Sequence, residues 1–85
     1  MSEFKWSKLK SARLKKTRGM SFEELTQCKI IKIGLHPNKP DQELIFFEVD
    51  GSVWVIPFVE TGNEIFLKTL YKSRKYTKMF KRGEL

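Results

Sequence analysis

Apolar residues near the start of the chain recur at helical intervals. Trp6, Leu9 and Ala12 are three positions apart, so a helix over residues 7–17 can pack this side while its lysines and arginines remain in water. Gly19 follows that segment, and glycine tolerates the left-handed conformation that commonly ends a helix. The pattern therefore predicts a basic N-terminal helix.

A second helix is predicted directly afterwards. Ser21 and Glu24 have the spacing of a capping box, in which each side chain accepts hydrogen bonds from backbone donors of the first turn. Glu23 and Glu24 also place negative charge at the helix N-terminus, where the helix dipole favours it. We expect this short helix to cover residues 22–27, and we interpret the two adjacent carboxylates as structural.

Further along the chain the pattern changes to β-strands. A β-rich run ends at Gly34, a loop with two prolines covers residues 36–41, and two further β-rich runs flank Asp50-Gly51. Asp-Gly between two such runs predicts a hairpin with a type I′ turn, which needs positive φ at both turn residues. A second hairpin is expected to turn at residues 60–63.

The short turn determines the register of the first hairpin. Two turn residues place Phe47 opposite Trp54, so alternate residues of both strands share one face, which we expect to be the core. Pro57 cannot donate to a sheet, so it is expected near the end of its strand or at a bulge. With Ile45 opposite Ile56, the predicted core face carries Ile45, Phe47, Val49, Trp54, Ile56 and Phe58.

The strand after the second hairpin extends this register. With four loop residues, alternation places Ile65, Leu67 and Thr69 on the core face. The opposite face then receives Phe66, Lys68 and Leu70, with Lys68 beside Val55.

The face opposite the core is also partly apolar and needs a cover. Tyr76, Met79 and Phe80 are spaced for one helical stripe near the C-terminus, among five lysines and arginines. A C-terminal helix, an oligomeric partner or a bound protein would each cover this face, and the sequence leaves the three open. The predicted fold class is α+β, with two N-terminal helices, an antiparallel meander sheet of about four strands and a short C-terminal helix.

Length and composition limit the class of protein. The chain has 85 residues, which we expect to form one domain over residues 1–85. No apolar run approaches the roughly 20 residues that span a bilayer, and the opening "MSEFKWSKLK" lacks the apolar core of a signal peptide. We therefore expect a cytoplasmic protein without membrane contact. The single cysteine, Cys28, cannot form an internal disulfide and is interpreted as a small core residue.

The net charge of +7 is concentrated at the two ends of the chain. Residues 1–19 carry seven Lys or Arg against one acid, and residues 64–85 carry seven against two, whereas residues 20–63 carry three against seven. If the ends meet in space, they form one positive surface that is typical of a polyanion binder. The alternative is two solvated helical faces.

The available chemical groups favour RNA as a substrate. The sequence has no Gly-rich phosphate loop, no HExxH motif and no His and Cys cluster, so we predict no metal site and no cofactor. What remains is His36, with lysines and arginines close to a sheet. RNA cleavage without a metal suits this set, because attack of the ribose 2′-hydroxyl on the adjacent phosphate needs a base, an acid and cations. The alternative is that His36 is a loop residue with no catalytic role.

Several motifs occur in a distinctive order: "FKW", a basic helix, "RGMSFEEL", "HPN", "VWVIPFV" and "EIFLKTLYKSRKYTK". In this order the chain resembles the BrnT-like toxins of bacterial type II toxin–antitoxin systems over essentially its whole length. The resemblance implies a fold related to RelE-type ribonucleases, cleavage of RNA, possible targets including ribosome-associated mRNA, and inhibition of translation. It also implies a cognate antitoxin, typically with a ribbon-helix-helix domain, through which the complex binds operator DNA.

The basic residues that lead out of the last strand match this family best. Lys68 and Arg74 are accordingly the candidates to stabilise the phosphate, and His36 is the candidate proton-transfer group. The residues expected to contact the rest of the RNA are Lys75, Arg13 and Lys16 along its backbone, and Tyr71 or Tyr76 by stacking on a base.

Two other functional classes remain open. A non-catalytic nucleic-acid-binding module would use the same basic surface and show salt-sensitive binding without cleavage. A protein-interaction subunit would instead use an exposed face of the sheet and retain its function after the terminal lysines are neutralised.

Overall fold

The computed structural model describes residues 3–85, and no helix in this range is long and apolar enough to cross a membrane. The expected domain over residues 1–85 stays a prediction, and its first two residues lie outside the described range. The elements in chain order are β1 (Glu3–Lys5), α1 (Lys8–Arg18), α2 (Phe22–Leu25), β2 (Lys29–Leu35), β3 (Glu43–Val49), β4 (Ser52–Thr61), β5 (Glu64–Leu67), β6 (Tyr71–Ser73) and α3 (Arg74–Lys81).

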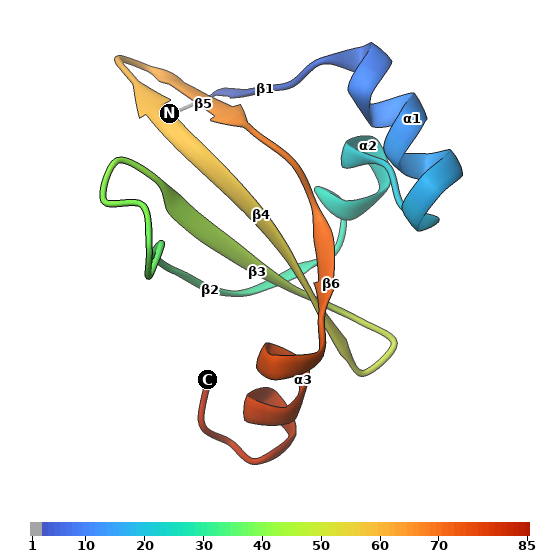
Figure 1. Ribbon diagram of the computed structural model, residues 1–85, viewed down its shortest axis with the longest axis vertical. Helices are drawn as coiled ribbons and strands as arrows, with labels where there is room; N and C mark the ends of the chain where they lie inside the picture. The colour runs from blue at the N-terminus through green and yellow to red at the C-terminus, as the bar shows by residue number, and fades with distance from the viewer. Residues whose placement is uncertain (1–2) are drawn as a thin grey trace.

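The strands form one mixed sheet in the order β1-β5-β4-β3-β2, and β6 also pairs with β4 (Figure 1). The α+β class is confirmed, but the prediction of about four antiparallel strands is wrong, because the described chain has six strands and β1 runs parallel to β5. The sequence did not predict β1 because three residues are too few to show an alternating pattern. The pairing of β1 depends on a distant partner, as the backbone bond from Glu3 N to Asn63 O (3.0 Å) shows.

The helix ends follow the local signals. Gly19 has φ 79° and its N–H donates to the carbonyl of Lys15, which ends α1 as predicted. The capping box of Ser21 and Glu24 is present at the start of α2. That helix ends at Leu25, two residues earlier than expected.

The packed side of α1 differs from the predicted one. Leu9 is 76% exposed and Ala12 is also exposed, whereas Ser11 and Leu14 are buried. Ser11 is stabilised in the interior because its hydroxyl accepts a hydrogen bond from Phe22 N (2.9 Å) and donates one to the Glu23 carboxylate. A polar residue therefore occupies the buried side, which the search for apolar periodicity missed.

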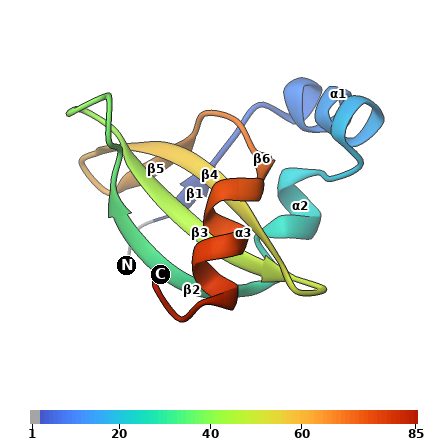
Figure 2. The same cartoon turned by 60° about the horizontal axis from the view of Figure 1, so that its bottom comes forward.

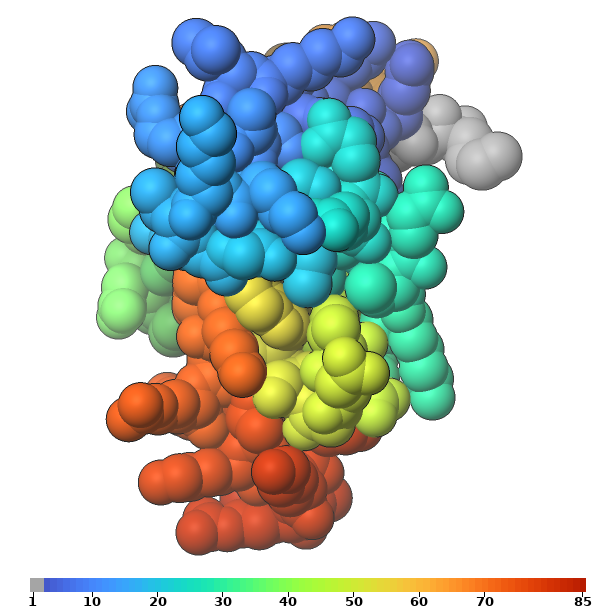
Figure 3. Space-filling view, turned by 90° about the vertical axis from the view of Figure 1, so that its right-hand side faces the viewer, coloured from blue at the N-terminus to red at the C-terminus, as the bar shows by residue number. Residues whose placement is uncertain are grey.

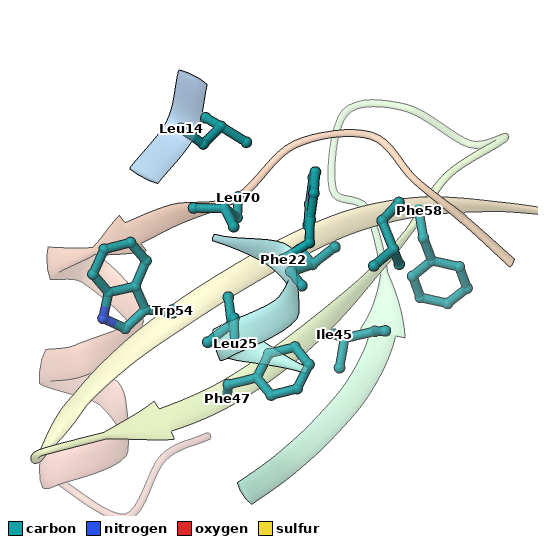
Figure 4. Packing of buried hydrophobic residues seen from close by; sticks show 10 residues of the cluster. Leu14, Phe22, Leu25, Ile45, Phe47, Trp54, Phe58 and Leu70 are labelled. Carbon is teal, nitrogen blue, oxygen red and sulfur yellow. The ribbon is translucent and has the colours of Figure 1, made fainter. Parts of the chain in front are cut away.

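The first hairpin has the predicted turn and register. Asp50 and Gly51 have φ of 51° and 82°, as a type I′ turn requires. Phe47 pairs with Trp54, and the face that they share packs against Phe22 and Leu25 of α2 (Figure 4). Cys28 is partly buried at the margin of this core.

The second hairpin turns at the predicted place with a tighter loop. Thr61 pairs with Glu64, so the loop has two residues instead of four. Ile65 and Leu67 nevertheless lie on the core face as expected, because the loop is shorter by an even number of residues.

The alternation then breaks after Leu67. β4 advances three residues from Phe58 to Val55, while the partner chain advances four, from Leu67 to Tyr71. One extra residue exchanges the two faces, so Leu70 is fully buried in the core instead of lying on the opposite face. The expectation that Lys68 lies beside Val55 is likewise wrong, because Tyr71 occupies that position.

The opposite face of the sheet is covered by α3 (Figure 2). Tyr76 packs edge-on against Phe46 with ring centroids 4.7 Å apart, and Phe80 contacts the same cluster. Of the three covers that the sequence left open, the C-terminal helix is the one observed. α3 thus lies at one end of the molecule and α1 and α2 at the other (Figure 1).

Candidate functional site

The segment between β5 and β6 is shaped by a proline on the neighbouring strand. The carbonyl of Pro57 accepts a hydrogen bond from Lys68 N (2.8 Å). The N–H and C=O of a strand residue point to the same side, so the donor that proline lacks would also face this segment. Pro57 therefore lies opposite a bulge, which is one of the two positions that the sequence left open for it, and the chain from Lys68 to Leu70 leaves the regular ladder there.

Arg18 attaches the end of α1 to this segment. Its guanidinium donates to the carbonyl of Leu70 and to the hydroxyl of Thr69, the latter over 3.4 Å. The basic N-terminal helix and the basic C-terminal region consequently meet at the bulge.

A cavity of about 350 Å³ lies beside the bulge. It brings together His36, Lys68 and Tyr71, which are far apart in the sequence. Two further cations at the cavity, Lys10 and Lys39, were missed, and only the high charge of the N-terminal segment pointed toward Lys10. The lining of this cavity, called the His36 cavity below, is Lys10, His36, Lys39, Gln42, Pro57, Lys68, Thr69 and Tyr71.

The imidazole of His36 is oriented by its own loop. Nδ1 accepts hydrogen bonds from the backbone N–H groups of Asn38 (3.0 Å) and Lys39 (3.2 Å). The backbone N–H of His36 donates to the carbonyl of Gln42 (3.1 Å), which closes the loop. Because Nδ1 is an acceptor, the neutral ring carries its proton on Nε2 and can offer only a donor there.

Two other side chains of the cavity are suited to binding anions. Burial raises the pKa of Tyr71 above 10.0, with a further contribution from the charge of Tyr76, so the Tyr71 hydroxyl remains a donor at neutral pH. Lys68 is exposed, and its ammonium lies 5.7 Å from the centroid of the Phe66 ring.

Arg74 lies in a different hollow from Lys68. This second cavity, of about 300 Å³, is located where α3 meets the beginning of β4 and the end of β6. We call it the α3 groove, and its lining is Ser52, Lys72, Ser73, Arg74, Thr77, Lys78 and Lys81. The two residues that the sequence grouped around one phosphate are therefore divided between two cavities.

The remaining predicted RNA contacts are dispersed. The ammonium of Lys75 lies 5.5 Å from the centroid of the Tyr76 ring, and Tyr76 itself packs on Phe46. Tyr71 packs against the same cluster as Tyr76, but it also lines the His36 cavity. Arg13 and Lys16 line a shallow hollow on the outer side of α1.

Few cations are neutralised by direct contact. Within residues 3–85 the ion pairs are Lys5 with Glu3 (3.4 Å) and Lys15 with Glu24 (2.9 Å). The lysines and arginines that line the His36 cavity and the α3 groove take no part in these pairs. Both cavities thus present uncompensated positive charge.

The sequence matches no protein-family model and none of the curated proteins. The structure is similar to the crystal structure of the Brucella abortus ribonuclease toxin BrnT, with a TM-score of 0.56. The match covers 86% of this chain and 97% of that chain at 16% sequence identity. At this identity the similarity concerns the fold, and it agrees with the resemblance in motif order. The chain therefore has a BrnT-like fold, in which a bulged mixed sheet is packed between N-terminal and C-terminal helices.

Proposed function

We propose that this protein is a ribonuclease toxin of a type II toxin–antitoxin module, which cleaves RNA without a metal and thereby inhibits translation. The observation that carries the proposal is the His36 cavity, where an oriented imidazole, a protonated phenol and three lysines converge. The BrnT-like fold supports the same function, because a protein of known structure with a similar fold is a ribonuclease toxin.

The proposed reaction is an internal transesterification. The ribose 2′-oxygen bonds to the adjacent phosphorus and loses its proton, while the bond to the 5′-oxygen breaks and that oxygen gains a proton. Lys68 would stabilise the negative charge that accumulates on the phosphorane, with Lys10 and Lys39 as neighbouring cations. Tyr71, protonated at neutral pH, would donate to a phosphate oxygen or to the leaving oxygen.

His36 would contribute as a hydrogen-bond donor through Nε2. The two backbone donors on Nδ1 oppose the tautomer that would leave Nε2 free to accept a proton. In this geometry His36 acts as a donor to the phosphate, and the 2′-proton passes to solvent water.

The test is controlled expression of single variants. Lys68→Ala is expected to reduce RNA cleavage by roughly 10²-fold, the usual effect of deleting one donor to a developing oxyanion, and to relieve growth arrest. Lys29→Ala, which removes an exposed lysine of β2 outside both cavities, is the control and should cleave like the wild type. Full growth arrest and cleavage by Lys68→Ala at normal protein levels would refute the assignment.

The occupied Nδ1 of His36 also favours a second candidate, a non-catalytic RNA-binding module. A binding module needs the cations and the donors of the cavity but no proton transfer. Purified protein that binds single-stranded RNA in a salt-sensitive manner and leaves it intact, both with and without ribosomes, would establish this second function.

The proposal includes a cognate antitoxin that covers the cationic cavities, with a ribbon-helix-helix domain that binds operator DNA. Uncompensated positive charge around both cavities favours an acidic inhibitory segment. Co-expression with the neighbouring reading frame should abolish growth arrest and yield a salt-sensitive complex. A complex that is unaffected by salt and by Arg74→Glu would assign inhibition to another surface.

A further inference from the structure

We propose that the α3 groove is a separate phosphate-binding subsite, which holds single-stranded RNA next to the cleavage point. This inference rests on the proposed function, because it takes the His36 cavity as the place of the reacting phosphate. It assigns Arg74 to a flanking phosphate instead of the reacting one. The reason is that Arg74 lines the α3 groove, while Lys68 and His36 line the other cavity.

The two cavities are joined by β6. Tyr71, the first residue of this strand, lines the His36 cavity, and Ser73, the last, lines the α3 groove. Two residues of extended chain span roughly 7 Å, which is comparable with one nucleotide step of an extended RNA strand. RNA with its reacting phosphate in one cavity can thus place a neighbouring phosphate in the other.

The α3 groove has a base held by hydrogen bonds and walls of long cationic side chains. The Ser73 hydroxyl accepts from Tyr76 N (3.1 Å), and the Thr77 hydroxyl accepts from Val53 N (2.8 Å). The first bond caps α3 with the last residue of β6, and the second attaches α3 to β4. Long side chains of the C-terminal segment project beside each other from this part of the surface (Figure 3). The cations of the groove are Lys72, Arg74, Lys78 and Lys81.

The composition of the groove favours RNA over a protein segment. All seven lining residues are polar or charged. No aliphatic or aromatic residue lines the groove to receive the apolar side chains of an amphipathic protein segment, whereas a phosphate backbone is bound by the lysine, arginine and hydroxyl groups that the groove supplies. The ligand class is therefore the sugar–phosphate backbone of single-stranded RNA.

The experiment compares two charge-matched double variants. Arg74→Gln with Lys78→Gln removes two cations from the groove, and Lys29→Gln with Lys32→Gln removes two exposed cations from β2. Affinity for a 2′-O-methyl oligouridylate, which cannot be cleaved, is measured by fluorescence anisotropy over a range of salt concentrations. For two lost phosphate contacts the slope of log affinity against log salt should fall by about 1.4, and the control should keep the wild-type slope.

Cleavage kinetics are measured on two substrates, a longer oligouridylate and a dinucleotide. The groove variant should raise KM for a longer oligouridylate without changing kcat, and should cleave a dinucleotide like the wild type. Equal salt slopes for the two double variants would overturn the inference. So would a groove variant that loses binding of polyglutamate but keeps binding of the oligonucleotide, because the occupant would then be an acidic protein segment.

Binding and cleavage separate this inference from the proposed function. If the wild-type protein cleaves no RNA but the two double variants differ in salt slope as expected, the proposed ribonuclease activity is refuted and the phosphate-binding role of the α3 groove is supported. Cleavage that depends on Lys68, with no difference in slope or KM, would support the ribonuclease and refute the groove.

Discussion

Arg18 connects α1 to the bulge that carries Lys68, and its replacement measures what this connection contributes. The Arg18 guanidinium donates to the Leu70 carbonyl and, over 3.4 Å, to the Thr69 hydroxyl. Hydrogen bonds to a charged group contribute about 1.5–3 kcal/mol when protected from water. Arg18 is exposed, so for Arg18→Ala we expect a loss of about 1–2 kcal/mol in the free energy of unfolding.

The assay combines global and local stability. A loss of this size lowers Tm by roughly 4–16 °C in a domain of this length, as followed by circular dichroism. Hydrogen exchange should also accelerate at the amide of Lys68, which donates to Pro57 in the same segment. Arg13→Ala, an exposed arginine earlier in α1, is the matched control. Equal Tm and equal Lys68 exchange in the two variants would refute the reasoning.

Three further predictions concern packing and titration. Hydrogen bonds, chiefly from Ser11, lower the pKa of Glu23 below 4.5, so this contribution to stability is present above that pH and lost as the pH falls. The Tm difference between wild type and Ser11→Ala should therefore shrink below about pH 4.5; a constant difference would contradict this. Burial raises the pKa of Tyr71 above 10.0, so the folded protein loses stability as the pH rises above that value. Tyr71→Phe should remove the later step of the phenolate absorbance titration, and an unchanged titration would contradict the burial of Tyr71. Phe47 is fully buried, and Phe47→Ala should cost about 3–5 kcal/mol in denaturant unfolding; a cost below about 1 kcal/mol would contradict the core position.

Much of the fold is encoded in short stretches of sequence. Asp50-Gly51 determined a type I′ turn because few residues tolerate positive φ there, and the turn then determined that Phe47 pairs with Trp54. The capping box at Ser21 and the glycine after α1 were equally predictable, since caps are satisfied by groups within a few residues.

The predictions from sequence were wrong where contacts between residues far apart in the chain determine the structure. The buried side of α1 includes Ser11, and a serine is stable there only because Phe22 and Glu23 from the next helix satisfy its hydroxyl. The pairing of β1 with β5 likewise joins opposite ends of the chain. Apolar periodicity reports on neither contact.

The candidate site shows the same division. The sequence by itself determined that cations are concentrated at both ends of the chain and that the chain has one histidine, in a loop with two prolines. Only the tertiary structure decided that His36, Lys68 and Tyr71 share one cavity while Arg74 lines another. The physical reason is the bulge opposite Pro57. One unpaired residue reverses the faces of the strand, and such an insertion depends on how two strands align, not on the sequence of either strand alone.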